Sequence, residues 1–299
     1  MNKGLLYAIG AYLAWGFLPV YWKALHTVPA IQIVGHRMVW SLAFIGLIVI
    51  FRRRWSPLFQ AIKNKKVLLI YFSAGTVLFF NWFIYVWAVN AGYVVETALG
   101  YFINPLVYVL LGVVLLREKL RPWQWLAVGA ATAGVLYLTF VYGSLPWIAL
   151  TLAFTFGFYG LFKKTAPLLA LDGLFLETGL LFLPAFGFLL FQEKSGIGAF
   201  GHANLTINLL LIMTGVATGL PLLLFAAAAR LIPLTTIGIL QYLAPTIQVL
   251  LGVFLYGELF TPSRLFGFSL IWLALVIYTV ESVIIRHRAA RTAALQCAA

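Results

Sequence analysis

The stretch PLVYVLLGVVLLREKLRP at residues 105–122 returns at residues 245–262 as PTIQVLLGVFLYGELFTP. Nine of the eighteen aligned positions are identical, including the proline at each end, one glycine and one glutamate. Proline, glycine and glutamate do not substitute for leucine in an apolar segment, so shared hydrophobicity does not explain the match. The two copies keep one constant offset, from Pro105 to Pro245 and from Pro122 to Pro262, which indicates an internal duplication in this 299-residue chain.

The composition places both copies in a lipid bilayer. Of all residues, 64% are hydrophobic and only 9% are charged, whereas about a quarter are charged in ordinary soluble domains. The apolar runs are long and lack a two-residue alternation, which favours a helical bundle over a β-barrel. The run at residues 4–22 is long enough to span and lacks a small-residue cleavage site, so we expect a first span rather than a signal peptide.

Ten apolar segments are predicted to cross the membrane as helices. They lie near residues 4–22, 30–51, 67–89, 94–116, 123–141, 146–162, 173–191, 205–229, 235–256 and 265–285. The sixth segment is short, so nine spans is the alternative. Five spans in each copy is an odd number, which forces the second copy into the membrane upside down. The sequence thus predicts an all-α polytopic membrane protein of ten transmembrane helices, built as two inverted five-helix repeats at residues 1–142 and 143–286 with a cytoplasmic tail at 287–299.

The basic residues predict the orientation of the chain. With the N-terminus inside, sixteen lysines and arginines fall on the inner side, against three on the outer side, Lys23, Lys194 and Arg264. Loops rich in lysine and arginine stay in the cytoplasm. We therefore expect a multi-pass protein of the plasma membrane, the inner membrane in a bacterium, with both termini cytoplasmic. The net charge of +13 arises mainly from residues between spans, which argues against a nucleic-acid partner.

Inverted repeats let a protein exchange two mirror-related shapes, each open to one side of the membrane, around a central site. The duplication therefore predicts a secondary transporter that works by alternating access with its site at the repeat interface, and we expect an exporter of a small metabolite or drug-like solute. A facilitative channel or a membrane-embedded enzyme is the alternative. The chain has one cysteine, Cys297, and no His-Glu-x-x-His motif or nucleophile elbow, so no catalytic residue, metal or cofactor is predicted. The sequence leaves the oligomeric state open.

Several motifs also resemble a known family. They are Trp15-Gly16-Phe17 with Pro19 and Tyr21-Trp22-Lys23, Gly35-His36-Arg37, Asn81-Trp82, the run at residues 85–90, Glu96 with the run at residues 99–106, and the run at residues 240–246. With these motifs the chain resembles the EamA-type drug/metabolite transporters, and among them the RarD-like subgroup, over nearly its whole length. The subgroup has a serine in its fourth-span motif where this chain has Thr97 and Ala98. The resemblance implies a ten-helix carrier with a central cavity built mainly from spans one to four and six to nine.

Three ionisable residues within spans are candidates for solute or proton binding, because such groups are costly to keep in a membrane. Arg37 lies about seven residues into the second span, about 10 Å below the outer surface by helical rise. It is predicted to contact an anion in the cavity, with Lys23 as a second cation; the alternative is a structural arginine bonded to carbonyls of a neighbouring helix. Glu177 in the seventh span, which the duplication places opposite His36, predicts a proton-coupled gate together with that histidine. The alternative role for Glu177 is to orient Lys163 and Lys164.

The fourth and ninth spans carry the signature of broken helices. Pro105 and Pro245 each remove a backbone donor in mid-segment, and the carbonyls near residues 101 and 241 then need other partners. The sequence therefore predicts paired kinks beside a solute site at the repeat interface, with a packing role as the alternative. Polar side chains precede the prolines by up to one turn, namely Tyr101, Asn104, Gln241 and Tyr242. On the third span, Asn81, Trp82 and Tyr85 are expected to complete the site with aromatic walls suited to flat solutes.

Overall fold

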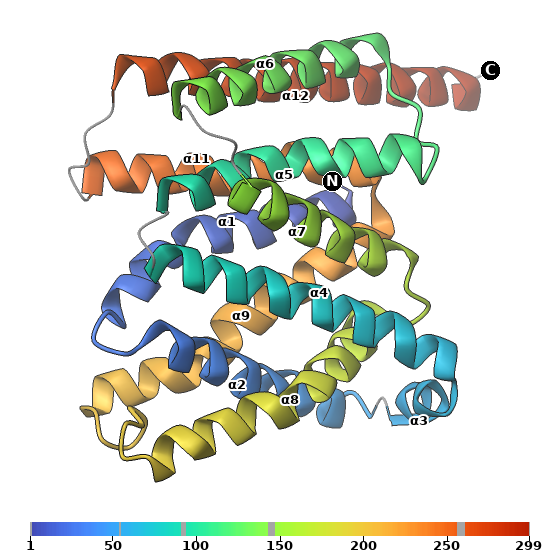
Figure 1. Ribbon diagram of the computed structural model, residues 1–299. Coiled ribbons are helices and arrows are strands. Elements are labelled where there is room, and N and C mark those ends of the chain that lie inside the picture. Colours follow the sequence, from blue (N-terminus) through green and yellow to red (C-terminus); the bar gives the residue numbers. More distant parts are fainter. Residues whose placement is uncertain (1, 54, 91–93, 143–146, 256–260, 299) are drawn as a thin grey trace.

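The computed structural model describes residues 2–298 apart from residues 54, 91–93, 143–146 and 256–260, and over these residues the fold is helical, without strands. Figure 1 shows the long helices lying side by side, with α6 and α12 together at the top of the view and α2 and α8 together at the bottom. The helices are α1 (Lys3–Ala24), α2 (Ala30–Phe51), α3 (Trp55–Lys63), α4 (Lys65–Asn90), α5 (Val94–Val114), α6 (Pro122–Tyr142), α7 (Trp147–Thr165), α8 (Ala170–Lys194), α9 (Leu205–Leu231), α10 (Leu234–Gln241), α11 (Leu243–Leu250), a π-helical turn (Leu251–Leu255) and α12 (Pro262–Ala298).

Eight helical segments of the described chain are long and apolar enough to cross a membrane. They are Lys3–Ala24, Ala30–Phe51, Lys65–Tyr85, Pro122–Val141, Ala170–Lys194, Leu205–Leu231, Leu234–Leu255 and Leu265–Ile285. The apolar part of α5, Leu99–Val114, is shorter. Helix α7, which corresponds to the short sixth predicted span, is not among the eight, so the expected total of ten spans stays a prediction. The expected tail at residues 287–299 continues α12 as far as Ala298.

Helix boundaries recur with the same offset as the duplicated stretch. Four helices of the first half each have a counterpart in the second half. The first residues of each pair are separated by the same offset as Pro105 and Pro245. The pairs of first residues are Ala30 and Ala170, Lys65 and Leu205, Val94 and Leu234, and Pro122 and Pro262. Three of the helices concerned also pack against their own counterparts, because α2 contacts α8, α5 contacts α10, and α6 contacts α12. Contacts of this kind are expected around a two-fold axis that relates two similar halves. Glu258, the partner of Glu118 in the repeated stretch, lies outside the described residues.

The two prolines of the repeated stretch have different local structures. The ninth predicted span is divided into α10 and α11, which meet at Tyr242 one turn before Pro245. Helix α5 instead runs through Pro105 as one continuous element, which differs from the expectation of paired breaks. A helix can retain a proline where packing supports the freed backbone. Here α5 packs closely on α10: a side chain at Gly238 would place its Cβ 2.6 Å from the carbonyl oxygen of Pro105.

Buried and partly buried aromatic rings pack together among α1, α5, α7 and α9. They are Tyr12 and Trp15 of α1, Tyr108 of α5, Phe156 and Tyr159 of α7, and Phe225 of α9. Phe225 contacts several other rings of this aromatic cluster. Its ring stacks on the ring of Tyr159 with 6.1 Å between centroids, and its centroid lies 5.6 Å from that of Trp15. Aromatic pairs at such separations add specific contacts to the burial of apolar area. The cluster therefore joins α1, α5, α7 and α9 through ring contacts.

Candidate functional site

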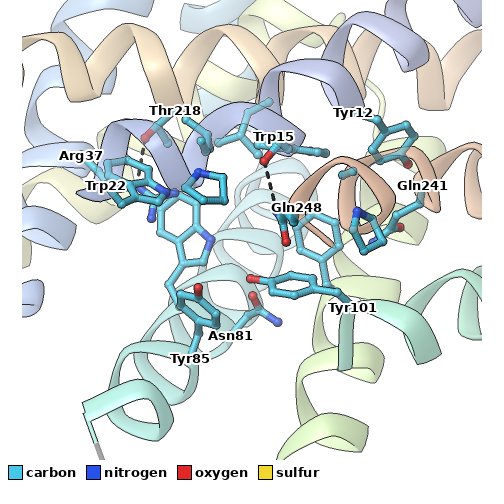
Figure 2. A pocket seen from close by; sticks show the side chains of 17 residues that line it. Tyr12, Trp15, Trp22, Arg37, Asn81, Tyr85, Tyr101, Thr218, Gln241 and Gln248 are labelled. Atoms are coloured by element: carbon cyan, nitrogen blue, oxygen red, sulfur yellow. Dashed lines mark hydrogen bonds between the residues drawn. The ribbon is translucent and has the colours of Figure 1, made fainter. Parts of the chain in front are cut away.

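A cavity of about 130 Å³ lies among helices of both halves of the chain. Helices α1, α2, α4 and α5 contribute from the first half, and α7, α9, α10 and α11 from the second. Figure 2 shows Arg37 and Trp22 at one end of the cavity and Gln241 and Tyr12 at the other. The lining residues are Tyr12, Trp15, Leu18, Pro19, Trp22, Arg37, Asn81, Trp82, Tyr85, Tyr101, Phe156, Thr218, Leu222, Gln241, Ala244, Pro245 and Gln248.

Arg37 is the one charged side chain among these described lining residues. Its guanidinium lies over the rings of Trp22 and Trp82, 4.8 and 4.3 Å from their centroids. Its Nε donates a 2.9 Å hydrogen bond to the Thr218 hydroxyl of α9. The described contacts of Arg37 are thus two cation–π contacts and one hydrogen bond to a hydroxyl.

The cavity walls combine aromatic rings with amide groups. Asn81 is held in place because its Nδ2 donates at 2.9 Å both to the Leu152 carbonyl and to the Thr155 hydroxyl of α7. The rings of Tyr85 and Tyr101 meet edge to face at 5.8 Å. A wall of aromatic rings with a few fixed polar groups is typical of sites that bind small organic molecules.

The far end of the cavity carries the amides of α10 and α11. Gln241 is 4% exposed, and its Oε1 has no hydrogen-bond partner among the described residues. Gln248 Nε2 donates to the Trp15 carbonyl at 3.2 Å. The residues Gln241, Ala244, Pro245 and Gln248, on both sides of the junction between α10 and α11, line the cavity.

A second pocket of about 530 Å³ lies beside the loop between α1 and α2. Trp22, Arg37 and Tyr85 line both this pocket and the central cavity. These three side chains therefore form the boundary between the two spaces. On the opposite side, the cavity residues Tyr12, Trp15 and Phe156 belong to the buried aromatic cluster.

Three residues that were predicted at the site do not line the cavity in the described structure. Asn104 is 1% exposed and its Nδ2 donates to the Ala153 carbonyl at 2.7 Å, so it ties α5 to α7 instead of lining the cavity. Tyr242 is fully buried in the core at the junction of α10 and α11. Pro105 packs against Gly238 of α10. Tyr242 directly follows the lining residue Gln241 and therefore points to another side of the chain, whereas Asn104 lies one turn from Tyr101 on a similar face and meets α7 instead.

Glu177 also lies outside the cavity, in a buried ion pair. Its carboxylate binds Lys163 Nζ of α7, and the side chains are 1% and 3% exposed. The lysine also lies over the rings of Tyr159 and Tyr71, 5.2 and 5.7 Å from their centroids. Lys164 is not part of this pair, because its Nζ donates to the Ile232 carbonyl at 2.9 Å. Of the two expected lysines, Glu177 thus orients only Lys163.

The pairing of Glu177 with His36 across the duplication needs correction. Helices α2 and α8 are equivalent and begin at Ala30 and Ala170, so the counterpart of Glu177 is Arg37. His36 is 6% exposed and packs against the ring of Phe200 in the loop between α8 and α9, at 5.3 Å. It lines a separate pocket between α2 and the end of α8. Lys23 does not line the cavity either.

Several lining residues were absent from the predicted site. Trp15 and Trp22 stand in the motifs that carry the family resemblance, so the sequence contained a signal for them. Thr218 and Gln248 had only the weak signal of a polar residue within an apolar span. Their place in the site depends on which helix packs opposite Arg37 and Trp15, and no local pattern encodes that partner.

Comparisons with known proteins agree in their assignment. Residues 2–140 match the EamA-like transporter family. The uncharacterized transporter YojE of Bacillus subtilis is 45% identical over 285 residues, covering 94% of this chain and 95% of the relative. Protein RarD of Streptomyces exfoliatus is 45% identical over 282 residues, covering 94% and 90% of the two chains. A crystal structure with 18% identity superposes with a TM-score of 0.69 over 93% of this chain and 98% of the other, which shows a shared fold.

Proposed function

Because the chain belongs to the EamA-like transporter family, we propose that it is a secondary transporter that carries a small metabolite or drug-like solute across the plasma membrane. The central cavity is the proposed solute site. The observation that carries this proposal is that both halves of the chain line one cavity, with Arg37 at one end and Gln241 at the other. Sites at the interface of two repeats, near interrupted helices, are typical of secondary transporters.

The proposed mechanism is alternating access between two inverted five-helix repeats, residues 1–142 and 143–286. Two findings support it: four helix starts recur at the offset of the duplicated stretch, and three helices pack on their own counterparts. The cavity adjoins a pocket beside the α1–α2 loop and is bounded on the other side by the aromatic cluster. A rocking movement of the two repeats about the cavity would close the side next to this pocket and open the side next to the aromatic cluster. We propose export as the direction, with both termini in the cytoplasm.

Proton coupling through Glu177 and His36 is a further part of the proposal. The support for Glu177 is its burial in a spanning segment with a single basic partner, Lys163. Ionisable groups at that depth commonly belong to ion or proton relays. A proton on the carboxylate would weaken the ion pair that joins α7 to α8. His36 would act separately, where α2 contacts the loop between α8 and α9.

A facilitative channel is the less favoured alternative. A channel needs a continuous polar lining from one side to the other, whereas Phe225 and Tyr159 are fully buried beside the cavity in the described structure. A membrane-embedded enzyme is disfavoured, because the matching family and the relative YojE are described as transporters.

Cysteine accessibility tests the mechanism. In a Cys297→Ser background, Leu18→Cys and Leu222→Cys each place a thiol at the cavity. A membrane-impermeant maleimide should label each thiol from both sides of oriented vesicles, at rates that change when solute is added. Leu183→Cys is the control: Leu183 is 74% exposed near the middle of the spanning helix α8, where lipid is expected to cover it, and the thiol should stay unlabelled. Labelling of the cavity thiols from one side only would contradict alternating access.

A further inference from the structure

We propose that the solute is an organic carboxylate with a flat ring, held by Arg37 at one end of the cavity and by Gln241 at the other. This inference rests on the proposed transport function, since it assigns a chemical class to the solute of the same cavity. It is carried by the charge of the cavity, by the partners of the acidic side chains, and by the shape of the walls.

The first step is the charge balance of the cavity. Among the seventeen described lining residues, Arg37 is charged and the others are neutral. A cavity at membrane depth that carries one positive charge favours an anion and disfavours a cation, because little water is present to screen the charge. Neutral solutes gain no such advantage.

The second step is that the described carboxylates are engaged elsewhere. Glu177, at the position equivalent to Arg37 in the second half, is paired with Lys163. Glu118 accepts hydrogen bonds from the backbone amides of Leu234 and Thr235, at 2.7 and 3.0 Å. The remaining described acids also have their own contacts, namely Asp172, Glu193 with His202, and Glu281 with Arg121. Among the acidic side chains that the structure describes, a set without Glu96 and Glu258, none thus contacts Arg37, and the solute can supply that carboxylate.

The third step is the geometry of the guanidinium. Trp22 and Trp82 hold it between their rings, and Thr218 accepts from its Nε. Its two terminal nitrogens have no hydrogen-bond partner among the described residues, and Arg37 lines both the central cavity and the adjoining pocket. A guanidinium fixed in this way can bind the two oxygens of a carboxylate together.

The fourth step is the shape of the remaining space. A water molecule takes about 30 Å³ in the liquid, so the cavity of 130 Å³ has room for about four waters or one small ring, and the adjoining pocket beside Arg37 extends this space. Trp15, Tyr101 and Phe156 provide flat apolar surfaces. Gln241 Oε1 lacks a donor among the described residues, so a ring N–H or O–H at the far end of the solute would satisfy it.

Indole-3-acetate is a suitable probe, because it joins a carboxylate to a ring with an N–H group. Its matched controls are indole-3-acetamide, which is neutral and nearly the same shape, and the cation tryptamine. Isothermal titration of the purified full chain should show the acid binding about ten- to a hundredfold more tightly than the amide, with tryptamine weakest. In Arg37→Gln, the acid and the amide should bind with about equal affinity.

Equal binding of acid and amide by the unmodified protein would overturn the inference, as would a preference that survives in Arg37→Gln. The wild-type comparison needs no variant, so a misfolded Arg37→Gln protein leaves the test intact. Thr218→Val offers a milder second variant, in which the preference should fall several-fold because the guanidinium loses a fixing bond.

Solute flux separates this inference from the transport proposal. In proteoliposomes, carboxylate-selective binding without catalysed exchange of labelled indole-3-acetate would support the site assignment and contradict transport of this solute class. The opposite result is that tryptamine or the amide is exchanged, that the acid is not, and that Trp82→Leu abolishes the exchange. This result would support transport and contradict the assigned solute class.

Discussion

Arg37 and Glu177 occupy equivalent positions, each being the eighth residue of its helix, α2 from Ala30 and α8 from Ala170. The two helices pack against each other, yet the two charges have different surroundings. Arg37 lines the cavity, whereas Glu177 is neutralised by Lys163 in the core. The two halves thus carry ionisable groups of opposite charge at the same register, and these groups have different surroundings.

Loss of the Arg37 charge should abolish transport while the protein still reaches the membrane. Arg37→Ala removes the one charged group of the described cavity lining and its contacts with Trp22 and Trp82. We expect solute affinity to fall by at least about tenfold, measured by flux in vesicles with matched protein levels. The control Val128→Leu on α6 should behave as the unmodified protein. Normal flux in Arg37→Ala would contradict solute binding by Arg37 and would indicate a structural role for it.

Removing one partner of the buried ion pair should destabilise the fold. Glu177→Gln leaves Lys163 charged and 3% exposed, which costs about 3–5 kcal/mol by analogy with other broken buried pairs. The double variant Glu177→Leu with Lys163→Met should recover most of that loss, because no uncompensated charge remains. Thermal unfolding in detergent measures both. A single variant as stable as the double one would refute a buried charged pair.

The same residue provides the test of proton coupling. In Glu177→Gln combined with Lys163→Met, the carboxylate that would take up the proton is gone and no lone charge is buried. Downhill solute exchange should persist, whereas uphill transport driven by a pH gradient should disappear. Uphill transport that continues in the double variant would exclude Glu177 from the relay.

The two prolines should differ in their effect. Pro245→Ala restores a backbone donor one turn after the junction of α10 and α11, so it favours one continuous helix. We expect a loss of transport larger than the loss of stability. Pro105→Ala should have the same kind of effect but a smaller one, because α5 is already continuous. Flux and thermal unfolding of both variants check the order, and equal flux in the two would contradict it.

Gln241 should contribute directly to solute binding. Gln241→Leu keeps the size of the side chain and removes the buried Oε1 that lacks a donor in the described structure. Solute affinity should fall several-fold with little change in stability, since no described protein hydrogen bond to that oxygen is lost. Asn104→Leu is the contrasting variant: it breaks the 2.7 Å bond to the Ala153 carbonyl and should lower stability first. Unchanged affinity in Gln241→Leu would remove this residue from the site.

Topology is tested by single cysteines in the Cys297→Ser background. Lys65→Cys at the start of α4 and Lys194→Cys at the end of α8 should react with an impermeant reagent from opposite sides of the membrane. The prediction follows from the sixteen-to-three distribution of basic residues. Reaction of both from the same side would remove the inverted repeat.

Six of the residues predicted at the solute site lie together around the cavity. Arg37, Asn81, Trp82, Tyr85, Tyr101 and Gln241 all line the cavity. They could be selected because a polar or charged group in an apolar span is costly, and such groups are retained where they face protein, water or solute. The same criterion also selected Asn104, Glu177 and His36. These three side chains meet partners in the core or at a loop instead. The energetic cost of a polar group at membrane depth indicates that the group is buried, but it does not specify which partner the group meets.

The sequence by itself determined that the chain is apolar enough for a bilayer, that its spans are helical, and that the stretch from Pro105 recurs from Pro245. Composition, periodicity and identity are local properties, so they can be read along one dimension. Only the tertiary structure decided that Thr218 meets Arg37, that Gln248 meets the Trp15 carbonyl, and that Lys163 neutralises Glu177. The first two contacts join residues far apart in the sequence, and all three depend on how whole helices pack, because rotation or sliding of one helix changes which side chains meet.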